Sequence, residues 1–202
     1  MKTQTLLPDE VIMKNMALNG ILISMAIVIS YFERLIPIGM FIPLPGIKLG
    51  LANIITLFAL FRINFKSAFY ITLIRCVVIS ILFGSLTSLA FSLTGGILAL
   101  IIMTFLKTGY NKVFSILGIS IAGAAAHNTG QIFAAAVILK STAVFAYLPI
   151  LLFSSLLTGT LTAVAAVSIF NHLDKIGFNR EHTGSIDIKE TVEKANCLEV
   201  KY

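Results

Sequence analysis

Long runs of apolar residues, separated by short polar or proline-rich breaks, fill the chain from about residue 17 to residue 170. An α-helix needs about 20 mainly apolar residues to cross the ~30 Å hydrocarbon core of a bilayer. The pattern therefore predicts an all-α membrane protein, a bundle of six transmembrane helices at 17–170 between a cytoplasmic segment at 1–16 and a polar cytoplasmic tail at 171–202. The predicted helices run over 17–36, 49–61 (a short one), 67–83, 86–106, 113–139 and 143–170.

The distribution of charge supports lipid as the solvent of this chain. Only 12% of the residues are charged, against about 25% in an ordinary soluble domain. Between Arg34 and Leu173 there is no Asp or Glu. The net charge of +6 comes without a basic run or a nucleic-acid reader motif. Single basic residues between apolar runs suit lipid headgroups, so we expect membrane lipid and no nucleic acid as partners.

Lys and Arg in short loops predict the orientation, because they are enriched on the cytoplasmic side. With the N-terminus inside, six basic residues lie inside and three outside. We therefore expect a multi-pass protein of the bacterial cell membrane with both termini in the cytoplasm. The inside group is Lys14, Arg62, Lys66, Lys107, Lys112 and Lys175, and the outside group is Arg34, Lys48 and Lys140.

The segment Arg34–Lys48 is irregular but apolar. Pro37, Pro43 and Pro45 prevent a continuous helix. Irregular backbone at membrane depth must be buried in protein or line a cavity. One interpretation is an outer cap over a ligand cavity, and the other is a partly immersed connector without a ligand role.

Arg75 lies about midway along the predicted third helix. A guanidinium at this depth costs several kcal/mol unless it has a partner. Glu33, at the outer end of the first helix, is the nearest acidic residue that the predicted bundle offers. Arg75 is either held by Glu33 or backbone carbonyls, or is the counter-ion of a bound anion.

A polar run lies in the predicted fifth helix, at His127, Asn128, Thr129 and Gln131. Residues four apart share a helical face, so Ser120, Gly123, His127 and Gln131 are predicted to form one stripe with Asn128 beside it. The stripe either makes interhelical hydrogen bonds or lines a pocket. A zinc site would need further ligands, and none is present at a suitable spacing.

Lys48 and Asn53 lie at the outer mouth of the short second helix, in GIKLGLANI. Lys48 either extends to the lipid headgroups or closes the outer end of a ligand pocket. On the first helix, Gly20 and Ser24 are small residues four apart, a spacing that permits close helix contact. They serve either packing within the bundle or the docking of a partner membrane protein.

Several motifs of catalytic proteins are missing from the sequence. There is no P-loop for ATP. The predicted bundle has no acidic residue other than Glu33, so it cannot form a Ser/His/Asp triad or hold Mg²⁺ on clustered aspartates. We expect a protein that is not an enzyme, with no catalytic residue, no metal ligand and no cofactor.

The segments ISYFERLIP, PLPGIKLGLANIITL, LIRCVVISILFGS, SLTGG and AHNTGQ together resemble the Gx transporter family, also labelled heptaprenyl diphosphate synthase component I. The resemblance covers about residues 17–170. That family is similar to the S components of energy-coupling factor (ECF) transporters, which bind the substrate in a six-helix bundle. The synthase label conflicts with the residues, since ionising an allylic diphosphate needs Mg²⁺ on clustered aspartates.

The similarity to S components implies a set of roles by analogy. The loop Pro37–Lys48 would cap the ligand, and Gly20 and Ser24 would meet a membrane coupling protein that carries two ATPases. The binding site for a small, anionic ligand would include Lys48, Asn53, Arg75, His127, Asn128 and Gln131.

Three functions compete at this stage. The first is a substrate-binding subunit for uptake of an anion such as a flavin phosphate, a carboxylate vitamin or a prenyl diphosphate. The second is a non-catalytic accessory subunit in prenyl diphosphate, quinone or extracellular electron-transfer pathways. The third is a structural scaffold in which every polar group serves helix contacts.

Overall fold

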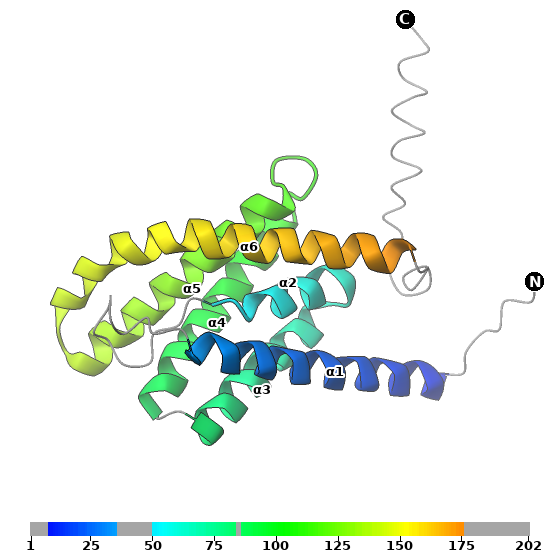
Figure 1. Ribbon diagram of the computed structural model, residues 1–202, viewed down its shortest axis with the longest axis horizontal. Helices are drawn as coiled ribbons and strands as arrows, with labels where there is room; N and C mark the ends of the chain where they lie inside the picture. The colour runs from blue at the N-terminus through cyan, green and yellow to red at the C-terminus, as the bar shows by residue number, and fades with distance from the viewer. Residues whose placement is uncertain (1–7, 36–49, 84–85, 176–202) are drawn as a thin grey trace, which may run out of the picture.

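The computed structural model describes residues 8–35, 50–83 and 86–175, and within these ranges the chain forms helices and short turns with no strand. The helices follow one another as an all-α bundle (Figure 1). In chain order they are α1 (Pro8–Leu35), α2 (Asn53–Arg62), α3 (Phe65–Phe83), α4 (Leu86–Lys107), α5 (Ile116–Leu139), the 3₁₀-helix η2 (Thr142–Tyr147) and α6 (Leu148–Lys175).

Four helical segments in the described ranges are long and apolar enough to cross a membrane: Met16–Glu33, Phe65–Phe83, Leu86–Lys107 and Thr142–His172. The predicted all-α membrane fold is thereby confirmed. The helix α5 has 24 residues, enough length for a span, but its polar run lowers its hydropathy. The helix α2 has 10 residues, about 15 Å at 1.5 Å per residue. The short helix expected at 49–61 is thus too short to span a bilayer by itself.

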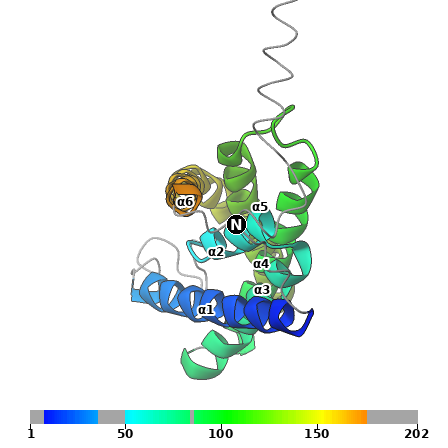
Figure 2. The ribbon, with the colours of Figure 1, turned by 90° about the vertical axis from the view of Figure 1, so that its right-hand side faces the viewer.

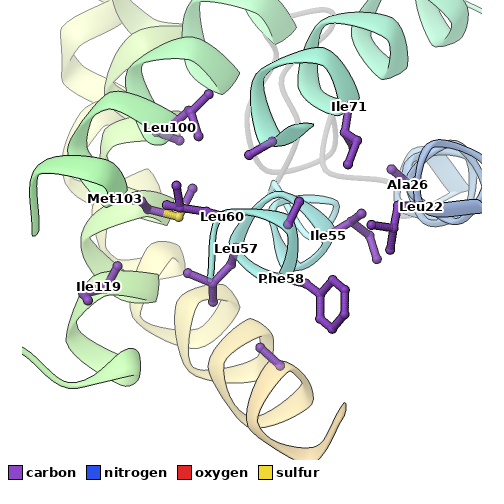
Figure 3. Close-up of a cluster of buried hydrophobic side chains, with 14 of the residues drawn as sticks. Leu22, Ala26, Ile55, Leu57, Phe58, Leu60, Ile71, Leu100, Met103 and Ile119 are labelled. Carbon is purple, nitrogen blue, oxygen red and sulfur yellow. The ribbon is translucent and has the colours of Figure 1, made fainter. Parts of the chain in front are cut away.

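The short helix α2 is the centre of the bundle. All of its residues from Ile55 to Leu60 are buried, and a helix that is buried on every side lies in the interior of a bundle. In Figure 2 it lies between α1 and α6. Figure 3 shows its side chains surrounded by those of the other helices. These neighbours are Leu22 and Ala26 of α1, Ala68 and Ile71 of α3, Ala99, Leu100 and Met103 of α4, Ile119 of α5, and Ala166 and Phe170 of α6.

Helix boundaries differ from the predicted ones where capping residues decide them. The helix α1 begins at Pro8, so it takes in part of the segment expected to precede the membrane domain. Proline suits a first helical position because its missing N–H would have no partner there. The helix α5 begins three residues later than expected, because the hydroxyl of Ser115 accepts from Gly118 N at 3.2 Å as an N-cap. The helix α6 follows η2 and extends beyond Phe170 to Lys175.

The start of α1 and the end of α6 lie at the same end of the molecule, on the right in Figure 1. Two basic residues form hydrogen bonds between helices near the C-terminal ends of α2, α4 and α6. Lys107 Nζ donates to Leu60 O at 2.6 Å, and Arg62 Nη2 donates to Phe170 O at 3.3 Å. Leu60 lies in the last turn of α2, where carbonyls have no partner within the helix, and the Lys107 ammonium satisfies one of them. The side of the membrane on which this end lies stays a prediction.

Candidate functional site

The turn before α2 brings three elements together at Gly50. Its φ of +85° is a left-handed conformation that glycine adopts without strain. The Gly50 N–H donates to Glu33 Oε1 of α1. A Cβ at Gly50 would lie 3.0 Å from His127 Cδ2 and 3.2 Å from Asn53 Nδ2. The Gly50 backbone therefore contacts α1, α5 and the first residue of α2.

Asn53, the first residue of α2, is 5% exposed. Neither its Nδ2 nor its Oδ1 has a hydrogen-bond partner within the described ranges. Burying an amide without a partner costs about 1–3 kcal/mol by mutational data. An ordinary core residue at this place would be apolar, so Asn53 points to a function other than packing.

Arg75 of α3 is 3% exposed and lies beside α1 and α4. Its Nη1 donates to the hydroxyl of Ser30 at 3.3 Å. Its Nε and Nη2 are buried with no hydrogen-bond partner among the described residues. Across α4, a Cβ at Gly96 would lie 3.6 Å from Nη2. The expected pairing with Glu33 is not the contact seen: Glu33 accepts from the Gly50 N–H, whereas Arg75 donates to the Ser30 hydroxyl.

His127 and Gln131 form a pair on the face of α5 that meets α4. Both are buried, and Gln131 Nε2 lies 3.0 Å from His127 Nε2. The pair packs against Gly95, where a Cβ would lie 2.7 Å from His127 O and 3.1 Å from Gln131 Cγ. Glycine at this position lets α4 approach closely enough for both polar side chains to sit at the interface.

These contacts close into a circuit of polar side chains and glycines from five helices and the turn before α2, which we call the polar ring. The circuit starts at Ser30 of α1, which contacts Arg75 of α3, and Arg75 lies beside Gly96 of α4. The neighbouring Gly95 packs against His127 and Gln131 of α5. His127 lies beside Gly50, whose N–H returns to α1 at Glu33, three residues after Ser30. The members of the polar ring are Ser30, Glu33, Gly50, Asn53, Arg75, Gly95, Gly96, His127 and Gln131. The ring thus gathers four of the predicted ligand-binding residues.

Asn128 is not brought together with these four. Its Nδ2 donates to Leu151 O and to the hydroxyl of Ser155, both at 2.9 Å and both on α6. Ser120 also faces α6, donating to Gly159 O at 2.8 Å and lying 2.5 Å from the Thr162 hydroxyl. The stripe expected on the fifth helix is confirmed for Gly123, His127 and Gln131, which face α4. It is wrong for Ser120, which faces α6 as Asn128 does.

We expect Asn128→Ala to destabilise the folded protein by about 1 kcal/mol, the value typical of interhelical hydrogen bonds in membranes. Ligand affinity should change by less than about twofold, because the side chain serves the contact with α6. Thermal unfolding in detergent and a binding titration measure the two effects. A loss of ligand binding without a loss of stability would show that Asn128 belongs to the ligand site.

The remaining predicted residues are placed as follows. Lys48 and the loop Pro37–Lys48 lie outside the described residues. Gly20 and Ser24 are exposed on α1, with the Ser24 hydroxyl donating to Gly20 O at 3.0 Å. Nothing lies within 4 Å of a Cβ built at Gly20. These two residues therefore do not pack against the described part of the bundle. No group of three His, Cys, Asp or Glu side chains is placed together in the described ranges.

Sequence reasoning missed Ser30 and Gly50 as parts of this site. Ser30 carried a signal, because it lies on the same helical face as Glu33, three residues away. Gly50 carried a weaker one, since it is a glycine just before a predicted helix start. Gly95 and Gly96 were not predicted as site residues, because their polar neighbours lie on other helices.

Comparison with known proteins gives one finding. A family model described as heptaprenyl diphosphate synthase component I matches residues 22–169, a range that contains every member of the polar ring. No curated protein and no solved structure matches the chain. The predicted family is thereby confirmed, while the similarity to S components of ECF transporters stays a prediction.

Proposed function

The chain belongs to the heptaprenyl diphosphate synthase component I family, and from the polar ring we propose that this member is a membrane subunit that binds a small anionic molecule for uptake. The observation that carries the proposal is Arg75, a buried cation whose Nε and Nη2 have no hydrogen-bond partner among the described residues of an apolar bundle. A buried guanidinium is costly in a membrane. A bound anion would offset that cost, whereas a packing role would be filled better by an apolar residue.

The proposal treats the protein as non-catalytic. Its described ring offers one guanidinium, one carboxylate, two amides and one imidazole, a set that suits recognition by charge and hydrogen bonds. We place the protein in the bacterial cell membrane, with both termini in the cytoplasm and the polar ring toward the outer side. Anions would then reach the ring from outside the cell.

The test of this function is gentle extraction followed by native mass spectrometry. We expect one small molecule bound per protein molecule, and none in protein carrying Arg75→Leu. Thermal unfolding with a panel of anionic vitamins and phosphates provides a second readout. Repeatedly empty preparations, with no thermal shift from any compound of the panel, would contradict the proposed function.

Uptake against a gradient would need an energy source, and we propose an ECF-type coupling membrane protein with ATPases as the partner. The support is the exposed small-residue pair Gly20 and Ser24 on α1. Small residues let a partner helix approach closely. The apolar side chains beside them on α1, Ile21, Met25 and Val28, are 59%, 45% and 52% exposed.

We expect Gly20→Leu to leave folding and ligand binding unchanged, because a Cβ at this position meets nothing within 4 Å. Co-purification with the coupling protein should fall at least tenfold, since the larger side chain keeps the partner helix at a distance. Met13→Leu, an exposed apolar change on the same helix, is the matched control. Equal recovery of the partner with Gly20→Leu would exclude this docking site.

A second candidate is a non-catalytic accessory subunit in prenyl diphosphate, quinone or extracellular electron-transfer pathways. The observation that favours it is the description of the family itself. The Arg75 guanidinium could accept a diphosphate headgroup, while the apolar side chains of the bundle shield the prenyl tail. Co-purification with a soluble prenyltransferase, without ATPases, would favour this second function over uptake.

A further inference from the structure

The unpartnered groups of Arg75 form one edge of its guanidinium. The bond from Nη1 to Ser30 occupies the opposite side, and Nε and Nη2 remain without hydrogen bonds to the described residues. The N–H groups of Nε and Nη2 point in parallel from the same edge. That fork matches the two oxygens of a carboxylate, which it binds through two hydrogen bonds.

The unpartnered groups of Asn53 form a second edge of different chemistry. A carboxamide presents one donor, Nδ2, beside one acceptor, Oδ1, and in Asn53 both are buried and without partners in the described ranges. A ligand that pairs with both atoms must carry an N–H donor and a C=O acceptor on neighbouring atoms, pointing to the same side. We call this pair of groups a cis-amide edge. Lactams, ureido rings and pyrimidinediones carry such an edge.

The two edges come from facing helices at the same level. The hydroxyls of Thr56 and Thr72 are 3.0 Å apart and join α2 to α3. Asn53 precedes Thr56 by three residues, and Arg75 follows Thr72 by three residues. Residues three apart share a helical face, and α2 and α3 run antiparallel through a short turn. Asn53 and Arg75 therefore both lie about one turn beyond the threonine pair, in the same direction.

Glu33 limits the charge that the described ring can accept. Its buried carboxylate accepts from the Gly50 N–H, and the Gly50 backbone lies beside the Asn53 amide. The described ring therefore holds one guanidinium together with one carboxylate. Arg75 can pair directly with one anionic group, and no other member of the polar ring is an Arg or Lys that could pair with a second one. A diphosphate brings more negative charge, and the Glu33 carboxylate would repel it in a site of low dielectric constant.

We infer that the ligand is a small ring compound with one carboxylate for Arg75 and a cis-amide edge for Asn53, and not a diphosphate. The inference rests on the proposed function, because it names the chemical class that the same site would bind. It also excludes a prenyl diphosphate as the ligand, which is the form of the second candidate function that the family description suggests.

Mass spectrometry of the compound released from gently extracted wild-type protein tests the inference, together with thermal-shift titrations of two probes. Orotate carries one carboxylate and cis-amide edges, and inorganic pyrophosphate represents the alternative. We expect a released compound with both groups, and stabilisation by orotate but not by pyrophosphate. Arg75→Lys, which keeps the charge and removes the fork, should weaken orotate binding at least tenfold, as should Asn53→Asp.

Two matched variants control for the substitutions themselves. Arg62→Lys changes a basic residue where α2 ends, and Asn171→Asp makes the same amide-to-acid change at an exposed position on α6. Both should bind orotate within twofold of the wild type. The wild-type spectrum and titrations remain decisive if a ring variant fails to fold.

The outcomes separate this inference from the function on which it rests. A released phosphate or diphosphate compound, or stabilisation by pyrophosphate alone, would overturn the carboxylate assignment and leave a ligand-binding function in place. Protein that releases no compound and is stabilised by neither probe would overturn both.

Discussion

Replacing Arg75 by Leu should weaken binding of the anionic ligand at least 100-fold, about 3 kcal/mol, while the ligand-free protein stays equally stable or becomes more stable. Truncating one member of a buried charge pair typically costs 2–5 kcal/mol of binding free energy. An apolar side chain of similar size removes the penalty of a buried cation. The Ser30 hydroxyl, which accepts from Arg75 Nη1, can turn to a carbonyl of its own helix.

A binding titration measures the loss of ligand affinity, and thermal unfolding in detergent measures whether stability is kept or rises. Arg62→Leu is the matched control, because Arg62 is a half-buried cation bonded to Phe170 O where α2 and α6 end. It should lower stability and leave ligand affinity unchanged. A large loss of stability in Arg75→Leu with binding retained would show that Arg75 is a structural residue.

Gly130→Ala should destabilise the protein by about 2–3 kcal/mol, the upper part of the range for overpacked interiors. A Cβ at Gly130 would lie 2.8 Å from Thr94 O, 2.9 Å from Gly95 Cα and 3.0 Å from Gly95 N. All three atoms belong to the α4 backbone, so relief requires the helices to separate. Separation would also move Gly95 away from His127 and Gln131, and ligand binding should fall with stability.

Gly118→Ala on the same helix is the matched control for this prediction. The nearest atom to a Cβ at Gly118 is the Ser115 hydroxyl at 3.7 Å, which is ordinary contact. Alanine should therefore stabilise α5 by about 0.5–1 kcal/mol, because it loses less backbone entropy than glycine. Thermal unfolding of the two variants compares them directly. Equal stability of both would show that α4 and α5 are not held at backbone contact.

Hydropathy predicted the bundle but not its interior. The four long apolar spans follow from length and composition, since lipid forces the backbone into helices. The short helix at Asn53–Arg62 is apolar apart from Asn53, Thr56 and Arg62, which suits either lipid or a protein core. Sequence alone could not decide between them, and the structure places α2 among the other helices.

The sequence predicted those parts of the polar site that can be recognised within a single helix. Arg75, Asn53, His127 and Gln131 were identified because large polar groups in lipid must face protein or a ligand. Asn128 was included because it follows His127 in sequence, but consecutive residues in a helix point in different directions. Contacts between helices, such as that of the Gly50 N–H with Glu33, depend on packing that no single segment encodes.

The most direct test of the polar ring as a ligand site is an experimental structure of the protein extracted gently with whatever it binds. The account predicts density for one small molecule between α2 and α3, within hydrogen-bond distance of Arg75 Nε and Nη2 and of the Asn53 amide. Density that shows both side chains bonded only to the protein itself, with no molecule between them, would contradict it.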